Sequence, residues 1–225
     1  MTTTQQFGKL RSMLWPVNRF ELKKLIPMIL LFFFILFNYT ILRDTKDTLI
    51  VTAGGAEIIP FLKVWGVVPG AIICMLAYSK MSNILSKPAL FYSTIIPFLV
   101  FFALFVTVLY PFRDALHPNA LCDYLQTVLP QGFNGMIGVI RNWTFSLFYI
   151  ASEMWGSMGV SLLFWGFANE INKVSESKRF YTIFLMFANV ALILSGNFIK
   201  WASKISGTSV AADPCLLYTS PSPRD

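Results

Sequence analysis

Charged residues are scarce in this sequence, and their scarcity argues against a soluble globular protein. Asp, Glu, Lys and Arg make up 13% of the 225 residues, against about 25% in an average soluble domain. Hydrophobic residues make up 56%, and the mean hydropathy is +0.62. A soluble protein of this size needs far more polar surface to cover its core. We therefore expect an all-α polytopic membrane protein embedded in a lipid bilayer.

Cysteine and histidine are too few for a metal site or a disulfide framework. Cys74, Cys122 and Cys215 are widely spaced without a CxxC pair, and His117 is the single histidine. The sequence also lacks the GxxxxGKS/T phosphate loop and the GxGxxG, HExxH and GxSxG motifs. We expect no metal, no cofactor and no enzymatic site. A phosphate-bearing ligand would have to be held by Arg and Lys side chains.

The net charge of +7 is interpreted as a topology signal and not as a nucleic-acid surface, because the basic residues lie in short segments between apolar runs. With a cytoplasmic N-terminus, the inner segments carry Lys9, Arg11, Arg19, Lys23, Lys24, Lys80, Lys87, Lys173, Lys178 and Arg179. The outer loop after the third apolar run then carries Arg113, Asp114 and Asp123. This balance favours that orientation, although it leaves Lys200 and Lys204 outside.

The apolar runs predict five membrane spans, since about 20 apolar residues cross a bilayer. A cytoplasmic segment 1–24 precedes a transmembrane domain 25–205, with spans at 25–51, 58–78, 88–112, 138–169 and 180–199. Lys63 is expected to snorkel from an end of the second span. The fourth span would be about 48 Å long, so it either tilts and protrudes or splits at MWGSMG. Residues 113–134 are expected to form an exposed loop with a short interfacial helix.

The final segment, 206–225, is polar and contains three prolines, and its CLLYTSPSPRD resembles a sequence-assembly artefact. We expect no helix there and exclude it from the fold. An odd number of spans followed by such a tail suggests an incomplete chain.

Four charges in RDTKD fall on the first apolar helix. At 100° per residue, Tyr39, Arg43, Lys46 and Ile50 share one face. Asp47 stands four residues after Arg43 and can pair with it, whereas Asp44 points nearly opposite Lys46. Lys46 is thus the charge least matched within its own helix. Either this stretch is the solvated end of the span, or Lys46 has a partner elsewhere.

The fourth span supplies such a partner. A polar stripe on it is formed by Asn142, Ser146, Tyr149, Glu153, Gly156 and Ser157. Glu153 lies near the middle, where an ionised carboxylate costs about 2.5 to 3.5 kcal/mol or more unless it faces water or a partner. Glu153 either clamps a cation structurally or serves function. Two stripes, one cationic and one with a carboxylate, describe the wall of an aqueous cavity.

The fifth span has a weaker stripe of Asn189, Gly196 and Lys200. Packing of a neighbouring helix against the small residues of ALILSG explains it equally well.

These stretches resemble the ATP/ADP translocases of the nucleotide transporter family, of the chlamydial type, found in obligate intracellular bacteria and in plastids. The resemblance covers residues 22–205 through FNYTILRDTKDTLIVTAGGAEIIPFLK, LSKPALFYSTIIPF, YPFRDALHP, RNWTFSLFYIASEMWGSMGVSLLFWGFANEIN and FANVALILSGNFIKW. The family's AEXWGS-like stretch reads SEMWGS here, which leaves the carboxylate in place.

The resemblance implies a fold like the N-terminal half of a major facilitator, with five of about twelve spans and the second half of the transporter missing. In that architecture the first and fourth helices line the cavity. It implies Lys46 and Glu153 as functional charges, and exchange of external ATP for internal ADP plus phosphate across a bacterial inner membrane, with a plastid envelope as the alternative location.

Lys46, helped by Arg43, would attract the phosphate chain, and Glu153 would balance Lys46 when the site is empty. We add Tyr149 and Asn142 as candidates from the stripe, and Asn189 as a candidate contact to the base. A carrier of NAD, or of other nucleotides by exchange or proton symport, is the alternative within transport. A non-transporting membrane subunit is the alternative from another class.

Overall fold

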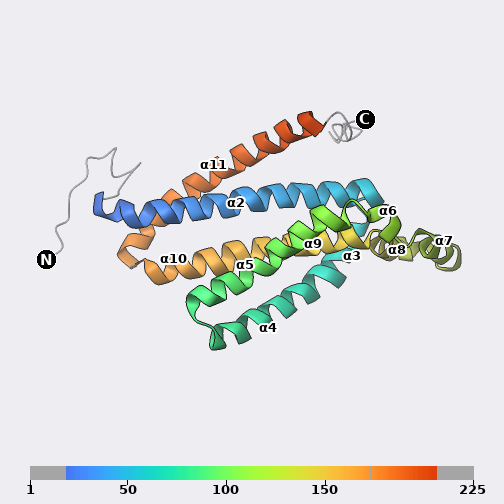
Figure 1. Ribbon diagram of the computed structural model, residues 1–225, viewed down its shortest axis with the longest axis horizontal. Coiled ribbons are helices and arrows are strands. Elements are labelled where there is room, and N and C mark those ends of the chain that lie inside the picture. Colours follow the sequence, from blue (N-terminus) through green and yellow to red (C-terminus); the bar gives the residue numbers. More distant parts are fainter. Residues whose placement is uncertain (1–18, 173, 207–225) are drawn as a thin grey trace, which may run out of the picture.

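The structure, a computed structural model, describes residues 19–172 and 174–206, and in these ranges it consists of helices and turns without a strand (Figure 1). The helices long and apolar enough to cross a membrane are Glu21–Gly54, Ile58–Ile84, Lys87–Leu109, Trp143–Ile171 and Arg179–Lys204. For the described residues, the predicted all-α fold with five membrane-spanning helices is confirmed. The expectations for segment 1–18 and for the tail after residue 206 lie outside the described residues.

Three of these spans combine α-helical and π-helical turns. The first span is α2 (Arg19–Gly54), and the fifth is α11 (Val174–Ser206). The second consists of α3 (Ile58–Leu62), the π-turn η1 (Lys63–Val67) and α4 (Val68–Ile84). The third consists of α5 (Lys87–Leu104) and η2 (Phe105–Leu109). The fourth consists of α9 (Trp143–Gly156), η4 (Ser157–Phe164) and α10 (Trp165–Ile171).

The fourth span begins later than the sequence pattern indicates. The polypeptide from Asn134 to Arg141 forms a separate helix, α8, and the backbone leaves helical geometry at Asn142, with φ −104° and ψ 41°. The backbone N–H of Asn142 donates to the Gly138 carbonyl and closes α8. Beyond this break the helix runs without a split through MWGSMG, where it changes to π-helical winding at Ser157.

Helix α2 is central to the packing, because it contacts both α11 and α9 (Figure 1). An aromatic core joins α2, η4, α10 and α11, and in it the rings of Phe32 and Phe164 of η4 stack at 4.1 Å. On α11 the small buried residues are Ala188, Ala191 and Ser195, which share a face at helical spacing and allow close approach.

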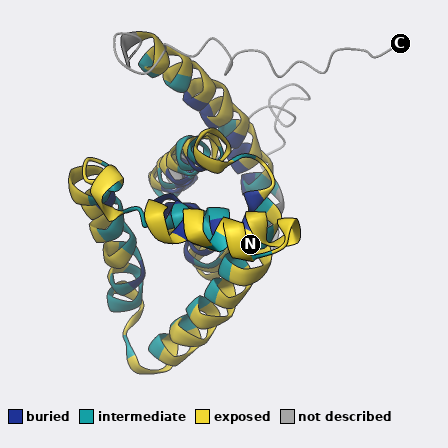
Figure 2. Cartoon of the chain, turned by 90° about the vertical axis from the view of Figure 1, so that its right-hand side faces the viewer, coloured by how far each residue is buried: buried dark blue, intermediate teal, exposed yellow. Residues whose placement is uncertain are grey.

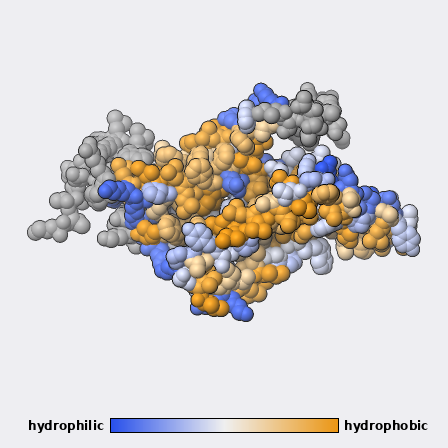
Figure 3. All heavy atoms as spheres, in the orientation of Figure 1, coloured by the Kyte–Doolittle hydropathy of each residue, from blue (hydrophilic) through white to orange (hydrophobic). Residues whose placement is uncertain are grey.

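Burial differs sharply between the spans. In its most apolar window the fourth span is 56% buried, whereas the second and third are 11% buried. In Figure 2 the buried residues gather where the helices meet, and the faces that point outward are exposed. Apolar side chains cover much of the side of the molecule in Figure 3. The exposed apolar faces of α4 and α5 suit lipid contact, and α9 is the helix around which an internal site can be built.

A helical hairpin follows the third span and protrudes beyond the end of α2 (Figure 1). It contains α6 (Arg113–Leu116), α7 (Asn119–Val128), η3 (Gln131–Phe133) and α8 (Asn134–Arg141). Arg141 Nη2 donates to Asp123 Oδ1 at 2.5 Å, and Trp143 Nε1 donates to the Leu116 carbonyl at 2.9 Å. The first contact holds α8 to α7 within the hairpin, and the second attaches the hairpin to the start of α9.

His117 lies in this hairpin, with Nε2 2.7 Å from Thr144 Oγ1. Burial lowers the pKa of His117 below its usual 6.5; the Asp114 carboxylate opposes this effect and Arg113 reinforces it. The unfolded chain therefore binds a proton first as pH falls. We expect unfolding free energy to be highest above pH 6.5 and to decrease as pH falls from there through the lowered pKa. Since His117 is the single histidine, its imidazole NMR signal in the purified, untagged chain measures this pKa directly.

His117→Asn should remove this part of the pH dependence of thermal unfolding. A midpoint for the imidazole signal at or above 6.5 would contradict the expected sign.

Candidate functional site

A polar cavity of about 470 Å³ lies between α2, the start of the second span and α9. Its lining residues are Tyr39, Arg43, Lys46, Asp47, Ile59, Lys63, Tyr149 and Glu153. The volume is within the range of roughly 300 to 1,000 Å³ that small-molecule sites occupy. Three cations and two carboxylates among these residues give the lining a net charge of +1 when all are ionised. Such a cavity suits an anion with several charges.

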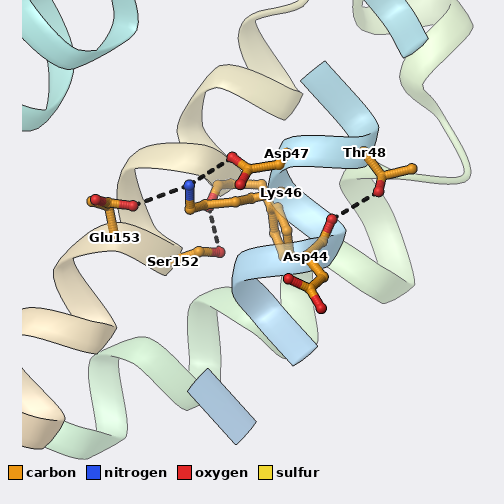
Figure 4. Close-up of polar contacts among 7 residues, drawn as sticks. Asp44, Lys46, Asp47, Thr48, Ser152 and Glu153 are labelled. Atoms are coloured by element: carbon orange, nitrogen blue, oxygen red, sulfur yellow. Dashed lines mark hydrogen bonds and ion pairs between the residues drawn. The ribbon is translucent and has the colours of Figure 1, made fainter. Parts of the chain in front are cut away.

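Lys46 is the best enclosed charge of this cavity, with only 3% of the residue exposed. Its Nζ donates to Asp47 Oδ1 at 2.8 Å and lies 3.1 Å from Glu153 Oε2, so two carboxylates hold one ammonium group (Figure 4). The same nitrogen lies 3.8 Å from the centre of the Tyr149 ring, where a cation is attracted by the ring face. Tertiary contacts therefore enclose Lys46, and it does not lie at a solvated helix end.

The glycine of the α9 stripe allows α2 to come close enough for this arrangement. A Cβ at Gly156 would collide with ring atoms of Tyr39, and Tyr39 is part of the cavity wall. One turn away from Glu153, the Tyr39 ring of α2 thus packs directly against the backbone of α9 at Gly156. Gly156, which the sequence pattern included among polar positions, contributes by its small size.

Four of the six residues proposed from the sequence line the cavity together: Arg43, Lys46, Tyr149 and Glu153. The expected pair between Arg43 and Asp47 does not form, because Asp47 turns to Lys46, its neighbour in sequence. No carboxylate of the described residues lies within ion-pair distance of Arg43. Asp44 is exposed, as its expected orientation away from Lys46 requires.

The other two proposed residues lie elsewhere. Asn142 is buried at the break between α8 and α9, where its Nδ2 donates to the Gly138 carbonyl at 3.2 Å. Asn189 is exposed on α11 and donates to the Leu185 carbonyl of its own helix at 3.0 Å. Neither lines the cavity. The buried face of α11 contains Ala188 and Ala191, and Asn189 lies outside that face.

Lys63 lines the cavity, although the sequence pattern indicates only a snorkelling lysine near the end of a span. It lies four residues after Ile59, another lining residue, so both share one helix face. It is also the first residue of the π-turn η1, and π-turns occur frequently at functional sites. The signal available in the sequence was a single charge in an apolar run, which does not reveal the direction in which it points.

Comparison with known proteins identifies the family. The model of the family described as "TLC ATP/ADP transporter" matches residues 1–216. The chain belongs to this family. ADP,ATP carrier protein 1 of Chlamydia muridarum is 62% identical over 206 residues, which cover 91% of this chain and 39% of the relative. The protein of the same name from Chlamydia pneumoniae is 59% identical over 219 residues, covering 95% of the chain and 42% of the relative.

A plant relative is also close. ADP,ATP carrier protein 1, chloroplastic, of Arabidopsis thaliana is 57% identical over 186 residues, covering 82% of this chain and 30% of the relative. The chain thus spans about two fifths or less of the length of these members of the TLC ATP/ADP transporter family. No solved structure matches the chain.

Proposed function

We propose that this chain forms the part of a nucleotide antiporter that carries the phosphate-binding cations, and that the antiporter exchanges external ATP for internal ADP plus phosphate by alternating access. The observation that carries the proposal is the cavity in which Arg43, Lys46 and Lys63 meet among membrane-spanning helices. Membership of the TLC ATP/ADP transporter family and the names of the chlamydial and plastidic relatives support this substrate class.

The charges of the cavity suit a phosphate chain better than a neutral solute. Guanidinium and ammonium groups bind phosphate oxygens through charge-assisted hydrogen bonds. Away from bulk water each of these interactions is stronger than at an exposed surface. Because Lys46 is already paired with Asp47 and Glu153, a phosphate oxygen that reaches it competes with those carboxylates.

This competition provides a physical link between substrate binding and movement. When the cavity is empty, Lys46 joins α2 to α9 through Glu153. When the phosphates of a nucleotide bind Lys46, Glu153 is released, and the ion pair between the two helices is lost in the same step. After release of the nucleotide, Glu153 pairs with Lys46 again, which avoids an isolated charge within the membrane. Tyr149 keeps Lys46 oriented in both conditions by its ring face.

We place the protein in a bacterial inner membrane with its N-terminus in the cytoplasm. The lysines at the turn between α4 and α5, Lys80 and Lys87, lie at the same end of the molecule as the start of α2, whereas the hairpin after the third span, with Asp114 and Asp123, is at the opposite end (Figure 1). This distribution supports the orientation by the positive-inside rule. The plastidic relatives leave a plastid envelope as the alternative location.

Exchange in vesicles tests the function. A hybrid carrier, in which this chain replaces the matching 206 residues of the Chlamydia muridarum carrier, would be reconstituted in vesicles preloaded with ADP and phosphate. We expect uptake of labelled ATP that depends on internal ADP and is competed by ATP and ADP more strongly than by NAD or by the other ribonucleotides. Uptake driven by a proton gradient without internal nucleotide, or preference for NAD, would contradict the proposal.

A further inference from the structure

Lys63 is a cation within a membrane-spanning segment without a described carboxylate to neutralise it. It lies inside the span Ile58–Ile84, where an unpaired charge is unfavourable unless it faces water or a ligand. No carboxylate of the described residues is within ion-pair distance of it. Both carboxylates of the cavity wall, Asp47 and Glu153, are bound to Lys46 instead.

The accessible positive charge of the cavity is therefore not on Lys46. Lys46 is 3% exposed and in contact with two carboxylates and an aromatic ring. Arg43 and Lys63 are both exposed and come from different walls, α2 and η1. An anion that enters the empty cavity meets these two cations before it can compete for Lys46.

The backbone at Lys63 supports a ligand-binding role independently of charge. Lys63 opens a π-helical turn, which inserts an extra residue per turn and redirects the side chains of the helix. Gly66 in this turn has Ile150 of α9 against it, so that a Cβ would collide with the Ile150 side chain. The turn is thus fitted tightly to α9 next to Tyr149, and Lys63 projects from a fixed element.

We propose that Lys63, together with Arg43, forms the initial binding site for the phosphate chain of the transported nucleotide, which is passed to Lys46 when Glu153 is displaced. This inference rests on the proposed nucleotide transport. It assigns Lys63 to capture of the substrate and Lys46 to the later step, so that substitutions at the two lysines should affect different kinetic quantities. The recognised feature is a chain of phosphates, whatever nucleoside it carries.

Competition by inorganic tripolyphosphate in the hybrid carrier tests this assignment, because that ion presents the phosphate chain without a nucleoside. We expect Lys63→Met to weaken competition by tripolyphosphate, and to raise KM for ATP and ADP, by about tenfold, which corresponds to about 1.4 kcal/mol. The maximal rate should change by less than about twofold, and competition by adenosine should not change. Lys63→Arg should restore most of the affinity.

Lys80→Met is the matched control, because Lys80 is an exposed lysine of the same membrane span that does not line the cavity. Unchanged KM and unchanged tripolyphosphate competition in Lys63→Met, or a loss equal to that in Lys80→Met, would overturn the inference. If the hybrid transports another phosphorylated compound in place of ATP and ADP, the proposed function fails. The effect of Lys63→Met on KM is then measured with that compound. If tripolyphosphate does not compete with any cargo of the unsubstituted hybrid, the inference about Lys63 is overturned as well.

Discussion

Lys46→Met should lower the maximal rate of ATP/ADP exchange at least about 100-fold. Removal of one partner of a fully buried ion pair costs about 3 to 5 kcal/mol. The cost here is smaller, because Lys46 is buried but the side chains of Asp47 and Glu153 are 44% and 30% exposed. Here two carboxylates, Asp47 and Glu153, would lose the ammonium group that separates them. The two carboxylates would then repel each other, and the ion pair between α2 and α9 on which the proposed cycle depends would be absent. Initial rates of labelled ATP uptake by the hybrid carrier measure the effect.

Glu153→Gln should also impair exchange, by about tenfold to 100-fold, since Asp47 still neutralises Lys46 in this variant. If the two residues act as one unit, the double variant should be no slower than Lys46→Met alone. Fully multiplicative effects of the two substitutions would show that they act separately and would contradict the proposed ion-pair exchange.

The control for these charge changes is the ion pair between Lys87 of α5 and Glu170 of α10. It also joins two membrane-spanning segments, but its side chains are 77% and 50% exposed and neither lines the cavity. Exposed pairs contribute about 0 to 1 kcal/mol. Lys87→Met and Glu170→Gln should therefore leave exchange nearly unchanged. The amount of folded carrier in the vesicles must be equal across all variants for the comparison to hold.

The predictable part of the fold and the site follows from repeating patterns. Long apolar runs identify membrane-spanning helices because the bilayer sets their length, and the polar stripe through Tyr149 and Glu153 stands out because it repeats at the helical period. Lys46 could be singled out because it had no carboxylate at a helical spacing in its own helix. These signals are properties of one segment at a time.

The features that could not be predicted depend on contacts between segments. The pairing of Asp47 with Lys46, in place of Arg43, accompanies the tertiary contact of Lys46 with Glu153, because the lysine side chain is drawn towards α9. The direction of Lys63 depends on how η1 fits against α9, and no spacing within its own span reveals this. Asn142 has no Pro beside it to indicate a break, yet the helix ends there.

Gly156→Ala should be the most disruptive single-carbon change near the cavity. The added Cβ would collide with three ring atoms of Tyr39, so that either the ring turns into the cavity or α2 moves away from α9. Overpacking of this kind costs about 1 to 3 kcal/mol of stability. It would also separate Lys46 from Glu153, which are held at 3.1 Å, and small errors of position at such sites can lower rates by about 100-fold. We expect a lower melting temperature together with at least about tenfold slower exchange.

Gly166→Ala is the matched control, because a Cβ at Gly166 of α10 meets no atom within 4 Å. An alanine there should be neutral or slightly stabilising, since alanine favours a helix over glycine by about 0.5 to 1 kcal/mol. Tyr39→Leu combined with Gly156→Ala removes the aromatic ring atoms that cause the collision, so the double variant should recover stability relative to Gly156→Ala alone. If Gly156→Ala melts at the temperature of Gly166→Ala, then α2 and α9 do not approach at Gly156, and the contact that brings Lys46 to Glu153 must be sought elsewhere along the two helices.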